Sequence, residues 1–160
     1  MGLNASVFCD CYETGKMRLP APQPELLYMD ESGQLYLDWK NPKADLNAFY
    51  DWLSIACEHG PLGQIVSHRL GNIASIGYLR NLLSDRADRF PILLTKVLYN
   101  GIHGGDFLSL TDVDLVAQEI DRFTSVHVSS KEYETMVREF ETQMRELIEV
   151  SRRLRKPIVF

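Results

Sequence analysis

The sequence predicts a single α+β domain, with one mixed, mainly antiparallel sheet and about four helices packed mostly on one face. Three observations lead to this fold class. Strand-like segments occur at both ends and in the middle of the chain, amphipathic helical segments lie between them, and the even strand–helix alternation of a doubly wound sheet is absent. The length of 160 residues and the apolar fraction of 45% are those of one globular unit.

The predicted strands are apolar runs bounded by turn residues. They cover 3–12, the hairpin arms 26–29 and 35–39, the segment 90–99, and the last three residues, 158–160. The segment 90–99 has the strongest strand pattern. Three prolines at alternate positions predict that 19–25 is an extended linker inside the domain.

Four helices are predicted from apolar residues at helical spacing. The first opens at the N-cap Asp45, runs through Cys57 and ends at Gly60-Pro61; the second covers 65–83. The third is capped by Ser109 or Thr111, and the fourth runs from about residue 130 to the basic cluster 152–156.

The charge and the cysteine content indicate which partners and which cellular compartment to expect. The net charge of −5 argues against a nucleic-acid-binding protein and would suit a basic partner. No apolar run approaches the roughly 20 residues that span a bilayer, so no membrane association is expected. Three cysteines without disulfide spacing fit a reducing compartment, which predicts a cytoplasmic location.

Cys9 and Cys11 are the first candidates for chemistry. Alternate residues of a strand share a face, so the two sulfurs should lie together, and His59, His68 or His103 could complete a tetrahedral zinc site. The spacing is shorter than in usual zinc knuckles, however, and no second cysteine pair exists. We therefore expect core cysteines and no cofactor, with a metal site that uses Cys9, Cys11 and His68 as the alternative.

Cys57-Glu58-His59 raises the question of a nucleophile and its base. On a helix, neighbouring residues point about 100° apart, so Cys57 and His59 should not reach each other. Cys57 also falls on the apolar stripe of its predicted helix. We therefore predict no catalytic residues in this segment.

The loop 100–106 and an aromatic group are the predicted binding surfaces. Glycines at 101, 104 and 105 allow close approach of a partner, and Asn100, His103 and Asp106 supply polar contacts. The loop matches neither a phosphate-binding nor a dinucleotide-binding motif. Trp39 and Trp52 are the predicted aromatic anchors.

The order of several short motifs resembles the immunity protein 70 type of small bacterial proteins from polymorphic toxin systems. The motifs are Met1-Gly2-Leu3, Ala48-Phe49-Tyr50-Asp51-Trp52, Arg89-Phe90-Pro91-Ile92-Leu93-Leu94, Gly105-Asp106-Phe107, Asp112-Val113 with Glu119-Ile120, and Pro157-Ile158-Val159-Phe160. The chain departs from that pattern at 96–101 and 70–83. The resemblance implies that the protein neutralises a cognate toxin by binding, and it brings no catalytic residues with it.

The resulting expectation is a non-catalytic, cytosolic bacterial protein that occludes a protein toxin through Asn100, His103, Asp106, Trp39 and Trp52. One alternative is a metal-binding protein or small hydrolase-like enzyme that uses Cys9 and Cys11, or His103 and Asp106. The other is a structural homodimer formed through a sheet edge.

Overall fold

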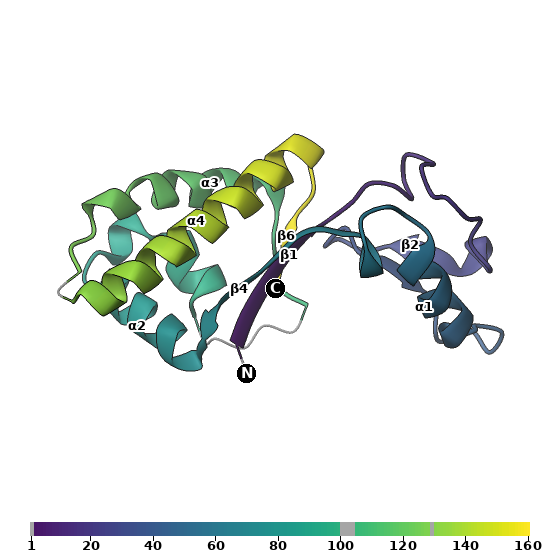
Figure 1. Ribbon diagram of the computed structural model, residues 1–160, viewed down its shortest axis with the longest axis horizontal. Coiled ribbons are helices and arrows are strands. Elements are labelled where there is room, and N and C mark those ends of the chain that lie inside the picture. Colours follow the sequence, from purple (N-terminus) through teal and green to yellow (C-terminus); the bar gives the residue numbers. More distant parts are fainter. Residues whose placement is uncertain (1, 100–104, 129) are drawn as a thin grey trace.

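A computed structural model describes residues 2–99, 105–128 and 130–160 (Figure 1). The chain forms two lobes. The main lobe comprises residues 2–8 and the described residues from 64 onward, and the small lobe comprises residues 9–63. The small lobe is thus a single insertion between the first strand of the main lobe and that strand's neighbour.

The main lobe is built on a four-stranded sheet with the order β4-β1-β6-β5. Its strands are β1 (Gly2–Phe8), β4 (Gln64–Asn72), β5 (Phe107–Leu108) and β6 (Ile158–Val159), and every pairing among them is antiparallel. β1 is central, because it pairs with β4 along its whole length and with β6 at Ser6. The first and last strands of the chain are therefore neighbours in the sheet of the main lobe.

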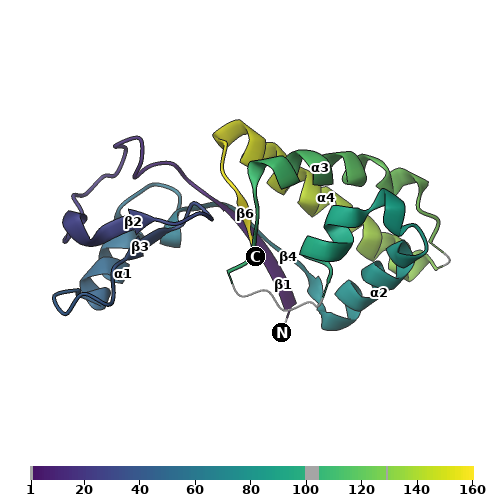
Figure 2. The same cartoon turned by 180° about the vertical axis from the view of Figure 1, so that it is seen from behind.

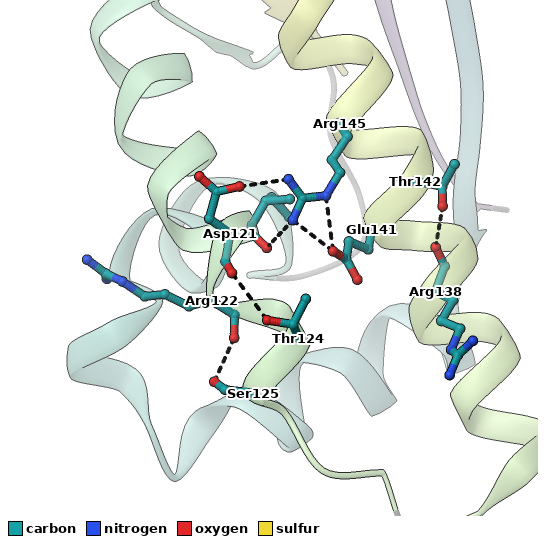
Figure 3. Close-up of polar contacts among 9 residues, drawn as sticks. Asp121, Arg122, Thr124, Ser125, Arg138, Glu141, Thr142 and Arg145 are labelled. Carbon is teal, nitrogen blue, oxygen red and sulfur yellow. Dashed lines mark hydrogen bonds and ion pairs between the residues drawn. The ribbon is translucent and has the colours of Figure 1, made fainter.

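Three helices pack against this sheet: α2 (Ile73–Ser84), α3 (Leu110–Asp121) and α4 (Lys131–Leu154). They gather on the side away from the small lobe (Figure 1). Alternate residues of β1, namely Leu3, Ala5 and Val7, enter the hydrophobic cluster that the helices complete. Arg145 of α4 joins its own helix to α3, because its guanidinium lies 2.7 Å from Asp121 and 2.8 Å from Glu141 (Figure 3).

The small lobe consists of a hairpin, β2 (Leu27–Met29) with β3 (Leu35–Leu37), and helix α1 (Leu46–Ile55), which lies beside the hairpin (Figure 2). Its five buried hydrophobic residues form a cluster separate from that of the main lobe. They are Leu37, Phe49, Trp52, Leu53 and Ala56. The Pro-rich segment 19–25 is held at this lobe by the Gln23 side chain, which bonds to the Lys43 carbonyl and the Asp45 amide.

The predicted α+β class is confirmed, and so are the hairpin and the helices that begin at Asp45, Ser109 and Ser130. Three details differ. The sheet has no parallel pair among the described residues, residues 64–72 form a strand where a helix was expected, and α1 packs on the hairpin and not on the main sheet. In the described part of the chain no helix combines the length and apolarity needed to cross a membrane.

The segment 90–99, predicted as a strand, is helical instead and contains a π-helical turn, η4 (Leu93–Val97). The cause is a buried carboxylate. Glu119 of α3 accepts hydrogen bonds from the amides of Ile92 and Leu93, each at 2.8 Å, which satisfies two amides at the start of the helical segment. Pro91 precedes them and suits a first helical position.

Candidate metal centre

Four potential metal ligands meet where the chain enters and leaves the small lobe. Cys9 and Cys11 follow the end of β1, and Cys57 and His59 follow the end of α1, shortly before β4 begins. Cys11 and Cys57 are buried but belong to neither hydrophobic cluster. The group therefore occupies the junction between the two lobes.

The spacing of the four ligand atoms is that of a tetrahedral site. The Cys9 and Cys57 sulfurs are 4.0 Å apart, the Cys11 sulfur is 3.3 Å from Nδ1 of His59, and all four ligand atoms lie within 4.8 Å of one another. Ligands at about 2.3 Å (sulfur) and 2.0 Å (nitrogen) from a tetrahedral Zn²⁺ stand about 3.8 Å (sulfur–sulfur) and 3.5 Å (sulfur–nitrogen) apart. Shifts of a few tenths of an ångström would bring the Cys9–Cys57 and Cys11–His59 pairs to these values.

Backbone hydrogen bonds position the ligand segments. The Cys9 amide donates to the Gly63 carbonyl at 2.8 Å, which ties the strand end to the chain that returns from the small lobe. The Lys16 amide donates to the Cys11 carbonyl at 2.8 Å and closes the turn after the first ligand pair. Gly63 has φ +70°, and a Cβ there would stand 3.1 Å from the Cys9 sulfur. Glycine is therefore required beside the sulfurs for both its conformation and its size.

His59 points one ring nitrogen at the cysteines. Its Nδ1 lies 3.3 Å from the Cys11 sulfur, while Nε2 lies 3.9 Å from the Glu58 carboxylate, whose other oxygen is 3.6 Å from Arg18. The distance of 3.9 Å is too long for a hydrogen bond. A carboxylate that accepts such a bond orients a ligating imidazole and increases its basicity, and Glu58 is the nearby residue that could do so after a small movement.

The thiols are costly to ionise in the protein alone. Burial raises the pKa of Cys9 to about 12, against the opposing effect of the Cys11 backbone amide, and burial also raises the pKa of Cys11. The three sulfurs are close enough that a negative charge on one disfavours a charge on the next. A divalent cation among them would stabilise all three thiolates together.

Cys9 and Cys11 lie together as predicted, and of the three histidines named from the sequence His59 joins them; Cys57 was not expected as a ligand. His68 is not in the group: its Nε2 lies 2.8 Å from Glu146 of α4. Cys57 and His59 take part because α1 ends at Ile55, before either residue, and not at Gly60. A Cys-X-His pair complementing the Cys-X-Cys pair was the signal available in the sequence.

Three of the five residues predicted to bind a partner are described, and these three do not form one surface. Trp39 is 64% exposed, whereas Trp52 is buried and donates from its indole nitrogen to the Leu19 carbonyl at 3.0 Å. Asp106 lies in the main lobe and accepts a 2.5 Å hydrogen bond from the Tyr99 hydroxyl. Asn100 and His103 fall outside the described residues.

Comparison with known proteins gives no relative: no family model matches the chain, and neither a curated protein nor a solved structure is detectably similar to it. The resemblance to the immunity protein 70 type therefore stays a prediction.

Proposed function

We propose that this protein binds one Zn²⁺ through Cys9, Cys11, Cys57 and His59, and that the ion has a structural role. The observation that supports this proposal is the convergence of four ligand atoms, from two segments far apart in the sequence, within 4.8 Å of one another. Three thiolates and one imidazole form a ligand set typical of structural zinc sites. Hard cations such as Mg²⁺ and Ca²⁺ select oxygen ligands and do not fit it.

The same ligand count argues against catalysis at the metal. A catalytic zinc keeps one position for water or substrate, whereas four protein ligands fill a tetrahedral shell. Two of the three sulfurs are also buried. A reducing compartment such as the cytoplasm would keep the thiols available for the ion.

The test is the metal content of protein purified without a histidine tag. We expect about one zinc per chain, and cobalt substitution should give the visible absorption of a tetrahedral thiolate site. The variants Cys11→Ser and His59→Ala should lose most of the bound metal. His68→Ala is the matched control and should retain it. Metal-free protein after purification in zinc-containing buffer, with no cobalt spectrum, would reject the proposal.

A second candidate function is the binding of a protein partner by the small lobe, and the distribution of charge and apolar surface favours it. Residues 9–63 contain nine acidic and four basic residues, of the 22 and 17 in the chain, so they carry the whole net charge of −5. Most of the exposed large hydrophobic residues in the described structure also lie there. They are Leu19, Tyr28, Trp39, Leu46, Tyr50, Ile55 and Leu62, against Ile73, Tyr99, Leu115 and Tyr133 in the main lobe.

An acidic surface with aromatic anchors would bind a basic protein, with the charge speeding encounter and the rings supplying affinity. In line with the motif resemblance, the partner of this second candidate is a bacterial toxin that the protein neutralises by occlusion. A pull-down from the native host with tagged protein should recover a large protein with a C-terminal toxin domain.

Matched surface variants make that experiment specific. Trp39→Ser combined with Tyr50→Ser should weaken capture about tenfold or more. Leu115→Ser combined with Ile73→Ser removes two comparably exposed side chains from the main lobe and should leave capture unchanged. If host cells that express the toxin yield nothing beyond the protein itself, the toxin role is rejected.

A further inference from the structure

The small lobe has a small hydrophobic core and little regular secondary structure to stabilise it. Its hydrophobic cluster contains five buried residues, while that of the main lobe contains 25. Its regular structure is one ten-residue helix, a hairpin with three residues in each strand, and two 3-10 turns of three residues each, Pro24–Leu26 and Pro61–Gly63. Units of roughly 55 residues with so small a core usually need a disulfide, a metal or a partner to stay folded.

The candidate metal centre lies where a cross-link would have the greatest effect. Cys9 and Cys57 are 48 residues apart in sequence, so one ion would close nearly the whole small lobe at its base. Beyond the metal centre, the contacts between the lobes include an ion pair from Lys156 to Glu13 and the approach of Gly33 to Pro157. These contacts hold one turn and the hairpin tip against the main lobe, and neither fixes α1.

The main lobe, in contrast, is complete without the insertion. Both strands that flank the small lobe, β1 and β4, pair with each other directly, and β6 closes the sheet on the other side of β1 (Figure 1). The helices α2, α3 and α4 pack on this sheet through a core to which residues 9–63 contribute no buried member. Loss of order in the small lobe can therefore leave the main lobe intact.

From these observations we propose that metal binding folds the small lobe: without the ion, residues 9–63 lose their fixed structure while the main lobe stays folded. This inference rests on the proposed zinc site. Binding and folding are then one equilibrium for this lobe, because the ligands converge only in its folded state. The acidic, aromatic surface of the lobe would be assembled only in the metal-bound protein.

The chain carries its own reporters for a test. Its two tryptophans, Trp39 and Trp52, both lie in the small lobe, so tryptophan fluorescence reports on this lobe alone. Trp52 is 7% exposed, and its emission should move to longer wavelength when the lobe opens. Most helical residues belong to α2, α3 and α4, so far-ultraviolet circular dichroism reports mainly on the main lobe.

The experiment removes the ion from the full-length protein with a chelator and then restores it with Zn²⁺. We expect a red shift of Trp52 emission, measured in the Trp39→Phe variant, with most of the helical signal retained and the shift reversed at one equivalent of Zn²⁺. Limited proteolysis of the chelated protein should cut within residues 9–63 and leave the main-lobe segments protected.

The outcomes separate the two proposals. If the protein binds zinc but its fluorescence and cleavage pattern do not change on chelation, metal-dependent folding is wrong and the zinc site stands. If the helical signal is lost together with the fluorescence change, the main lobe is not independent and this inference is again wrong. If no zinc binds at all, the proposed function fails first.

Discussion

Twenty-five buried hydrophobic residues pack together in the main lobe, whereas five do so in the small lobe. The main lobe adds polar links between its helices, such as the Arg145 guanidinium held by Asp121 and Glu141. In the small lobe, four potential metal ligands, the three cysteines and His59, lie close together at its base. If the proposed ion is bound, the main lobe is stabilised mainly by its core and the small lobe mainly by its metal centre.

The difference can be expressed as free energy. Burial of a large apolar side chain contributes about 1.5–3 kcal/mol, so the main lobe has an ample source of stability in its core. An ion that binds only the folded small lobe stabilises it by mass action, by about 4 kcal/mol when the free ion concentration is about a thousand times the dissociation constant. With five buried hydrophobic residues in its cluster, this lobe would depend on that contribution to stay folded.

The largest effect is expected from a cavity in the main lobe. Phe140 is 1% exposed and its ring centre lies 5.7 Å from that of Phe123. Phe140→Ala should lower the free energy of unfolding by about 3–5 kcal/mol, measured by circular dichroism in urea. The loss should be the same with and without chelator, because the ion is not part of this core. Leu115→Ala, at an exposed site, should change it by less than about 0.5 kcal/mol.

The counterpart in the small lobe is the loss of one ligand. Cys57→Ser should destabilise this lobe by up to about 4 kcal/mol, the value for a thousandfold excess of the free ion over the dissociation constant, since a hydroxyl is a poor zinc ligand. In the variant, the tryptophan fluorescence transition should occur at a lower urea concentration than in the wild type, and excess Zn²⁺ should not raise its midpoint. The circular dichroism transition of the main lobe should not change. Coincident transitions for the variant and the wild type in zinc buffer would contradict the assigned role of the ion.

Local signals in the sequence were sufficient for most of the fold. The N-caps Asp45 and Ser109, the long apolar stripe of α4 and the hairpin turn at 30–33 each specify their element through near neighbours. Two segments were assigned to the wrong type of secondary structure, and both depend on distant partners. Residues 64–72 become a strand because they pair with β1, and η4 is helical because Glu119 caps it from 26 and 27 residues away.

The candidate site was half predictable for the same reason. Cys9 and Cys11 were expected to lie together as alternate residues of a strand; they do lie together, but in the segment that follows β1, which ends at Phe8. His59 was one of the three histidines named beside them. Cys57 and His59 were assigned to the continuation of α1, where apolar spacing places Cys57 on the buried stripe. The early end of α1 at Ile55 turns both residues toward Cys9 and Cys11, and this depends on the return of the chain through Gly63 to β4.

The next largest effect is expected from Glu119, whose carboxylate binds the segment 90–99 of the main lobe. Glu119→Gln should cost about 1–3 kcal/mol, because the two oxygens of Glu119 accept from the Ile92 and Leu93 amides separately. In Gln an NH2 group replaces one oxygen, so one of these amides faces another donor and loses its partner. Burial raises the pKa of Glu119, against the effect of these amides. Its contribution to stability is therefore fully present below the unfolded pKa of about 4.3 and is lost as pH rises through the folded pKa.

The free-energy difference between wild type and Glu119→Gln should consequently be largest at low pH and should shrink as pH rises. Urea unfolding followed by circular dichroism at several pH values measures it. The exposed Glu139→Gln, on α4, is the control and should show no such trend. A difference that grows with pH would mean that the amide bonds outweigh burial at Glu119.

A second carboxylate of α3 should show the opposite pH dependence, with a smaller effect. Burial acts to raise the pKa of Asp112, but hydrogen bonds from Lys96 and Ser109 outweigh it and lower the pKa. Its stabilisation is present above the unfolded pKa of about 3.9 and is lost as pH falls through the folded pKa. Asp112→Asn weakens the cap at Ser109 and should cost about 1 kcal/mol at neutral pH and less in acid. An equal cost at pH 7 and pH 2 would exclude an ionic contribution.

The smallest effect, on metal affinity, is expected from alanine substitutions at Gly60 and Gly63, and comparing them distinguishes backbone strain from crowding at the metal centre. Gly60 and Gly63 both have φ +70°, so alanine should strain the backbone of the small lobe at either position. The strain should be larger at Gly60, about 1–3 kcal/mol, because its ψ of −172° belongs to a region nearly restricted to glycine. Only at Gly63 would the new Cβ crowd the Cys9 sulfur, at 3.1 Å, since nothing lies within 4 Å of a Cβ at Gly60. Gly63→Ala should therefore weaken cobalt or zinc binding severalfold in a competition titration with a chelator. Gly60→Ala should bind the metal as tightly as the wild type once the folding cost of each variant, measured separately, is subtracted. Equal metal affinities for the two variants would show that the Cys9 sulfur can move away from a Cβ at position 63. That result would contradict a metal site whose ligands are fixed by the backbone at the base of the small lobe.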